Sequence, residues 1–152
     1  MGLCGKEAKQ MQLKCEGNLI FDLIAYCPYE LSKLSPQIHG CDLVEGQWGT
    51  VGAIIQFTFT VDDKTVFAKE RIIALDEENK TIQFETIEGQ LLEAYKNCTI
   101  TVQSSNNSIS ASLEFEKKNE CIPNPTAYLN SFDKFIRDIE PNYQAIPRLA
   151  TN

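Results

Sequence analysis

His39 is the one histidine in this sequence of 152 residues, and imidazole is the side chain that ordinarily titrates closest to neutral pH. It is therefore the first place to look for proton transfer. A general base needs a neighbour that positions it, and the sequence has no G-x-S-x-G motif that would supply a serine nucleophile. The pattern favours a hydrogen-bonded strand histidine over a catalytic one, so His39 stays a candidate only.

Carboxylates and phenols are the other side chains able to act on a bound molecule. In an apolar environment such a group orients a ligand hydroxyl, and burial shifts its pKa so that it becomes a general acid or base. The more usual place is a solvated strand face for a glutamate and half-buried packing for a tyrosine. We assign no catalytic residue, and we retain Glu70 as a candidate for catalysis and Tyr26 for binding from a set that also holds Glu85, Glu88, Tyr29, Tyr95 and Tyr128.

The segment CDLVEGQWGTVGA (41–53) has glycines at 46, 49 and 52, a density typical of phosphate-binding loops. Such a loop ends in Gly-Lys-Ser or Gly-Lys-Thr and opens a helix. Here the next residues are IIQFTFTVDD, rich in β-branched and aromatic side chains that favour a strand. The sequence therefore predicts a hairpin loop whose glycines adopt positive φ angles.

Composition narrows the function classes. The chain has the length of one domain, and its 14 Lys and Arg against 21 Asp and Glu give a net charge of −7, the wrong sign for binding nucleic acid or anionic membranes. Six cysteines without a C-x-x-C pair, beside one histidine, offer no metal-ligand spacing, so we expect reduced thiols, no metal and no cofactor. No secretory leader or bilayer-spanning apolar run is apparent, so we expect a cytoplasmic protein, without membrane insertion and monomeric.

Hydrophobic periodicity predicts the elements that must position these residues. A strand is expected over 5–15, then a helix from Asn18 as N-cap to Pro28, and a short helix over 29–34. The pattern next predicts strands over 37–45, 54–61, 64–75, 80–89, 95–103 and 108–117, with a tight turn at Asp62-Asp63. Apolar residues at period 3.6 then predict an amphipathic helix over 126–140, closed by Pro141.

A single curved antiparallel sheet with the last helix on its concave face follows from this order, because sheet and helix must each bury an apolar side. The predicted fold class is α+β. One domain is expected over residues 1–152.

Two long segments resemble a known family. LSPQIHGCDLVEGQWGTVGA (34–53) and AKERIIALDEENKTIQFETIEGQLLEAYKNCTITVQ (68–103) are similar to the plant major latex proteins of the Bet v I superfamily, and especially to the kirola-type members of kiwi fruit. The run Trp-Gly-Thr-Val-Gly (48–52), with E-G-x-L-x-E-x-Y-K (88–96) downstream, is specific in combination. His39 departs from the family, which more often carries glutamine there, so no family role passes to it.

The resemblance implies a helix-grip fold: a seven-stranded sheet around a long C-terminal helix, two short helices in a V, and a large internal cavity. It also implies binding of amphipathic small molecules such as phenolics, steroids, hormones or other specialised metabolites, and a role in defence or stress. For an arbitrary sequence of this size a solid core is the better expectation, and only the resemblance favours a cavity. Alternation along the elements then predicts its lining: Met11, Leu13, Tyr26, Phe57, Phe59, Phe67, Ile82, Phe84, Ile109, Leu113, Phe115, Leu129, Phe132, Phe135 and Ile136.

Three functions remain open at this point. The first is a binding protein that holds a hydrophobic or amphipathic ligand. The second is a cofactor-free enzyme of specialised metabolism, a cyclase or isomerase, which a buried glutamate beside a tyrosine or His39 would favour. The third is a hormone sensor, which an exposed apolar patch near residues 26–34 would favour.

Overall fold

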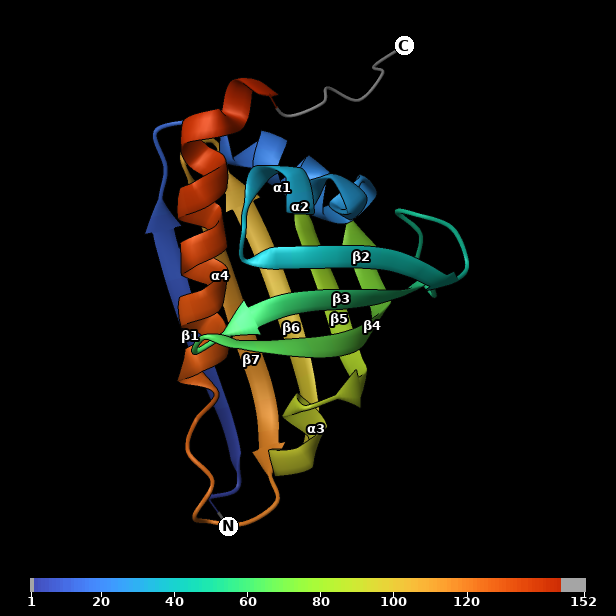
Figure 1. Ribbon diagram of the computed structural model, residues 1–152, viewed down its shortest axis with the longest axis vertical. Coiled ribbons are helices and arrows are strands. Elements are labelled where there is room, and N and C mark those ends of the chain that lie inside the picture. The colour runs from blue at the N-terminus through green and yellow to red at the C-terminus, as the bar shows by residue number, and fades with distance from the viewer. Residues whose placement is uncertain (1, 146–152) are drawn as a thin grey trace.

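Seven antiparallel strands form one continuous sheet in the order β1-β7-β6-β5-β4-β3-β2 (Figure 1). The computed structural model describes residues 2–145, with side chains through Asn142. The strands are β1 (Cys4–Gln12), β2 (Ile38–Glu45), β3 (Ile54–Val61), β4 (Lys64–Asp76), β5 (Thr81–Gly89), β6 (Tyr95–Ser105) and β7 (Ser108–Lys117). From β2 onward each strand pairs with the next along the chain, and β1 pairs with β7. The predicted seven-stranded α+β fold is confirmed.

The sheet is curved because its strands are interrupted by bulges. Register shifts occur in β2 between Ile38 and Gly40, and in β4 between Ile72 and Ala74. Each bulge bends its strand and increases the local twist. The sheet wraps in this way around α4 (Thr126–Ile139), the long helix that runs along it in Figure 1.

Helix α4 presents its apolar stripe to the sheet as predicted, with Leu129, Phe135, Ile136 and Ile139 buried. Its Ser131 hydroxyl also donates a 2.6 Å hydrogen bond to a backbone carbonyl of β3. Beyond Ile139 the chain continues in a 3₁₀ segment, η2 (Glu140–Ala145), so the helix ends one residue before its predicted end.

Three short helices connect β1 to β2: α1 (Gly17–Tyr26), η1 (Pro28–Glu30) and α2 (Leu31–Leu34). Helix α1 ends shortly before Pro28 and helix α2 shortly before Pro36, as the sequence predicted. The prediction of Asn18 as N-cap was wrong, because α1 begins at Gly17 and Glu16 is its N-cap. The Gly17 N–H donates to the Asn106 carbonyl at 2.9 Å, and a Cβ at Gly17 would lie 2.3 Å from the Ser105 carbonyl oxygen. The β6–β7 turn thus docks on the helix start, and the Asn18 amide oxygen accepts from Ser104 instead.

The glycine-rich segment is the β2–β3 hairpin loop, as predicted. Gly46, Gly49 and Gly52 have φ angles of 84°, 73° and 96°. At Gly49 a Cβ would lie 2.5 Å from the ring of Tyr26, so this loop packs closely on the end of α1. The loop has a structural part to play, and no helix follows it to form a phosphate site.

Helix α3 (Leu91–Ala94), between β5 and β6, was not predicted from the sequence. It is a single turn, and only its Leu91 is buried. The buried side chains form two clusters, a large one between the sheet and helices α1 and α4, and a smaller one around Leu91, Tyr95 and Phe115. Among the described residues, no helix has the length and apolar character required to cross a bilayer.

Candidate functional site

A cavity of about 140 Å³ lies between the concave face of the sheet and helix α4. Eighteen of the described residues line it, and all but Glu70, Tyr128 and Ser131 are apolar. Ordinary ligand pockets measure about 300–1,000 Å³, so the cavity is smaller than the resemblance implies. Aromatic rings take up the space: Phe57 packs edge-on against Phe84, with ring centroids 6.2 Å apart, and Phe132 packs against Phe135 at 4.7 Å.

The structure brings seven of the fifteen predicted lining residues to this cavity. They come from β3, β5, β7 and α4, and are Phe57, Phe59, Phe84, Leu113, Leu129, Phe132 and Phe135. Five others are buried in the large core cluster without lining the cavity: Met11, Leu13, Ile82, Ile109 and Ile136.

The remaining three predicted residues lie elsewhere. Phe115 is buried in the smaller cluster, against Tyr95. Phe67 is half-buried on β4, where Ala68 and Glu70 of the opposite strand face line the cavity. Tyr26 lies at the end of α1, where its hydroxyl donates to the Glu77 carboxylate.

Several lining residues were missed by the sequence reasoning. Ile100 and Val102 lie on β6, whose two faces are nearly equally apolar, so alternation did not indicate the inner one. Ala68 and Ala111 are small side chains, so they leave space for the cavity. For the same reason they add little to the hydrophobic pattern from which inward-facing residues are predicted. Helices α1, α2 and α3 contribute Ile24, Leu31 and Leu91, to which strand alternation does not apply. Ile38 comes from the start of β2, where a register shift interrupts the alternation.

Glu70 carries the one carboxyl group among the described residues of this lining. It lies on β4 opposite Thr86 of β5, and it is only 3% exposed. The Thr86 hydroxyl lies 3.0 Å from Oε1 and 2.9 Å from Oε2 of the carboxyl group. Burial raises the pKa of Glu70 to about 8, although the Thr86 hydrogen bond acts in the opposite direction. At pH 7 the group is therefore mostly a neutral carboxylic acid inside an apolar cavity.

Two other titratable groups lie near Glu70. Burial raises the pKa of the Cys98 thiol on β6 to about 12, and the charge of Glu70 adds to this rise. Burial likewise raises the pKa of Tyr128 on α4 to about 12. Both groups stay protonated at neutral pH, so Glu70 is the group of this cluster whose charge changes in the physiological range.

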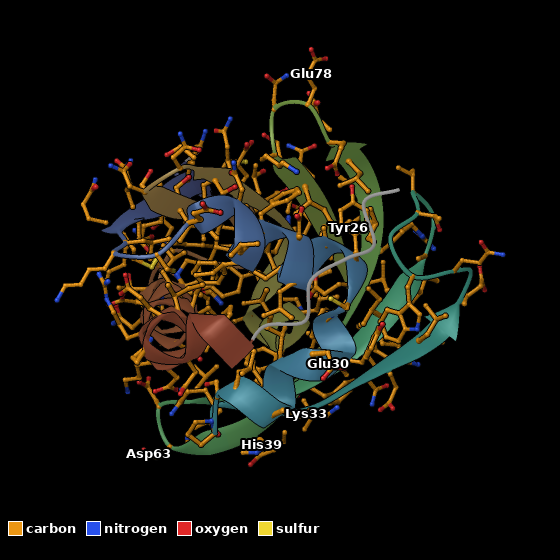
Figure 2. The ribbon with its side chains drawn as sticks, turned by 90° about the horizontal axis from the view of Figure 1, so that it is seen from above. Tyr26, Glu30, Lys33, His39, Asp63 and Glu78 are labelled. Carbon is orange, nitrogen blue, oxygen red and sulfur yellow. The ribbon has the colours of Figure 1, made fainter. Side chains whose placement is uncertain are left out.

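His39 is exposed on β2, at the periphery of the molecule in Figure 2. It is not among the residues that line the cavity. Its Nε2 lies 2.6 Å from the Thr60 hydroxyl, which is the hydrogen-bonded strand position that the sequence favoured. Glu85 and Glu88 lie on β5 in partly exposed ion pairs with Arg71 and Lys69, at 3.5 and 3.4 Å. Of the two catalytic candidates, only Glu70 is placed where it can meet a ligand.

The segment 26–34 was expected to show an apolar patch if the protein were a hormone sensor. Tyr29 is the only large apolar side chain of this segment that is exposed, at 45%. Its ring packs against Trp48 of the glycine-rich loop, with centroids 5.0 Å apart. The segment therefore presents one supported aromatic ring instead of a patch.

The order of elements, the helix held against the curved sheet and the apolar cavity between them also occur in known proteins. Residues 5–143 match the model of the pathogenesis-related protein Bet v 1 family. The chain belongs to the Bet v 1 family. Within it, MLP-like protein 31 of Arabidopsis thaliana is 32% identical over 145 residues, which cover 91% of this chain and 85% of the relative.

Solved Bet v 1-type structures agree with this assignment. Ginseng major latex-like protein 151 from Panax ginseng superposes with a TM-score of 0.89 at 36% identity, covering 93% of this chain and 98% of the other. Norcoclaurine synthase from Thalictrum flavum, solved with dopamine and hydroxybenzaldehyde, has a TM-score of 0.69 at 18% identity, covering 96% and 90%. That second likeness shows the shared fold alone. The predicted major latex protein resemblance is confirmed, while the special likeness to kirola-type members stays a prediction.

Proposed function

We propose that this Bet v 1-family protein binds a small hydrophobic or amphipathic molecule in the cavity beneath α4. The observation that carries the proposal is a cavity of about 140 Å³ with an almost wholly apolar wall and one carboxyl group. Burial of apolar ligand surface would drive binding, at about 25 cal/mol per Å². The single polar group would set the orientation of the ligand.

Cavity volume limits the size of this ligand. An engineered protein cavity of about 150 Å³ admits benzene, so a guest of one ring with a short substituent fits here without rearrangement. Phenolics of one ring meet this limit, whereas steroids need α4 or the β2–β3 loop to move. We place this function in the cytoplasm, where free thiols such as the six described here are stable, in a monomer with a part in defence or stress.

The experiment is a binding titration with a one-ring probe, cyclohexylmethanol, followed by NMR of the backbone amides. Ala68 lines the cavity, and Ala68→Leu would fill it; Ala74→Leu adds the same side chain at an exposed position of the same strand. We expect saturable shifts around the cavity in the natural protein and in Ala74→Leu, and none in Ala68→Leu. Equal binding by both variants would refute the proposal, as would a natural protein that binds neither this alcohol nor its amine and carboxylate analogues.

An enzyme of specialised metabolism is the second candidate, and Glu70 is the observation that favours it. Its pKa of about 8 lies near neutral pH, where a group serves best as general acid or base. Such an enzyme would be a cofactor-free cyclase or isomerase. Incubation of the protein with extract of its source tissue, followed by mass spectrometry, separates the candidates: a bound adduct supports binding, while Glu70-dependent loss of an extract component supports catalysis.

A further inference from the structure

The hydrogen-bonding capacity of Glu70 is mostly unused. Among the described residues, its one hydrogen-bond partner is the Thr86 hydroxyl, which is within 3.0 Å of both carboxyl oxygens. A hydroxyl has a single hydrogen to donate, whereas an ionised carboxylate has about four acceptor positions. Since Glu70 is 3% exposed and lines the cavity, only a molecule inside the cavity can occupy the remaining positions.

Among the described residues, no positive charge lines the cavity to balance Glu70. None of the described residues that line it is a lysine, arginine or histidine. The ionisable groups that face Glu70 from neighbouring elements are Cys98 on β6 and Tyr128 on α4, and burial raises the pKa of each to about 12. They remain neutral at pH 6–8. An isolated buried carboxylate is unfavourable, so the empty protein retains the proton on Glu70.

We propose that the ligand of this cavity is a small apolar amine whose ammonium group pairs with the Glu70 carboxylate. This inference rests on the proposed function, since it names the class of molecule that the cavity binds. On binding, the Glu70 carboxyl gives its proton to solvent, the ammonium keeps all of its hydrogens, and N–H···O hydrogen bonds form to the carboxylate. No covalent bond to the ligand forms or breaks.

Charge and hydrogen bonding distinguish an amine from other small ligands. An anion beside Glu70 would keep its carboxyl group protonated, because two negative charges in an apolar cavity repel each other. A neutral alcohol forms one uncharged hydrogen bond, whereas an ammonium forms charge-assisted bonds that are about twice as strong. The low-dielectric wall strengthens the attraction between the two charges. The Thr86 oxygen offers a further acceptor next to the carboxylate.

The test compares three probes with one shape: cyclohexylmethylamine, cyclohexylmethanol and cyclohexanecarboxylate. Binding is measured by titration calorimetry between pH 6 and 8, in two buffers of different ionisation enthalpy, so that proton release is counted directly. The amine behaves like a lysine side chain, with a pKa of about 10.4, and stays charged throughout. With a Glu70 pKa of about 8, amine affinity should rise by about 50-fold from pH 6 to pH 8, with close to one proton released at pH 6.

Two variants assign the effect to this carboxyl group. Glu70→Gln keeps the shape but removes the charge, and it should lower amine affinity at pH 8 by at least about tenfold and abolish proton release. Glu114→Gln removes a carboxylate from an exposed position of β7. This variant should retain both the amine affinity and the proton release. Alcohol binding in Glu70→Gln shows that the variant is folded with its cavity intact.

The outcomes separate this inference from the proposed function. Binding of the alcohol as tight as that of the amine at pH 8, or amine binding without proton release, would overturn the inference and leave the proposed function standing. Binding of none of the three probes would refute both. Preference for the carboxylate probe would show that the cavity selects an anion, against the amine proposal.

Discussion

Replacement of Glu70 by glutamine should make the protein more stable, and increasingly so as the pH rises. The folded protein keeps a proton on Glu70 up to about pH 8, whereas in the unfolded chain the group has its ordinary pKa of 4.5. Stability from this group is therefore fully present below pH 4.5 and is lost as the pH rises toward 8. Glutamine does not titrate, and its amide can keep the hydrogen bond with Thr86.

The size of this effect follows from the pKa difference. Each pH unit between the two pKa values costs the natural protein about 1.4 kcal/mol of unfolding free energy. From pH 5 to pH 7 the advantage of Glu70→Gln should therefore grow by about 3 kcal/mol. In a domain of this size that corresponds to an increase of about 5–11 °C in the difference between the two melting temperatures.

Urea unfolding of the natural protein and of Glu70→Gln at pH 5, 6, 7 and 8 measures the difference in their unfolding free energies directly. Other titrating groups affect both proteins equally, so they cancel in the difference. Glu114→Gln serves as the control, and its difference from the natural protein should be flat. A Glu70→Gln difference that stays constant within about 0.5 kcal/mol across this range would show that Glu70 ionises normally, and the reasoning on the cavity would fail with it.

Three further changes test other parts of the structure. Thr86→Val removes the hydrogen bond that lowers the pKa of Glu70, so a ¹³C NMR titration should show that pKa rise by about one unit; no change would mean that the bond is absent. Phe132→Ala enlarges the cavity, so affinity for a two-ring probe should increase in a fluorescence titration. The free energy of unfolding should fall by about 2–4 kcal/mol. An unchanged preference between one-ring and two-ring probes would argue against Phe132 as part of the cavity wall. Gly49→Ala places a Cβ against Tyr26 at positive φ, and thermal unfolding should reveal a loss of about 1–3 kcal/mol; a neutral result would indicate that the loop shifts freely.

The fold was predictable because its sequence signals are local and repeated. The period of 3.6 in α4, the Asp62-Asp63 turn and the three loop glycines each determine an element without reference to the rest of the chain. Asp62 and Asp63 indeed have φ angles of 49° and 63°, as a tight hairpin turn requires. Helix α3 escaped prediction because a single turn gives too short a period to recognise, although Leu91 to Ala94 are all good helix formers.

The cavity was harder to predict than the fold because it depends on which face of each strand is turned inward. Bulges in β2 and β4 change the alternation within a strand. Phe67 was assigned to the inner face of β4, on which its neighbours Ala68 and Glu70 lie instead. Glu70 was retained from several carboxylates as a candidate for catalysis, but its burial could not be assigned from the sequence. Its burial follows from β4 lying near the centre of the sheet and from the position of α4 above it, which no local pattern reveals.

The pairing of β1 with β7 constrains when the cavity can exist during synthesis of the chain. Cys4 pairs with Glu116, so the first strand has no partner until more than a hundred further residues have been made. Contacts between such distant residues form late and slow folding, because a long loop must close first. Helix α4, the last wall of the cavity, comes still later in the chain. A ligand therefore cannot assist folding of the nascent N-terminal half, and the protein must complete its sheet before it can acquire its guest.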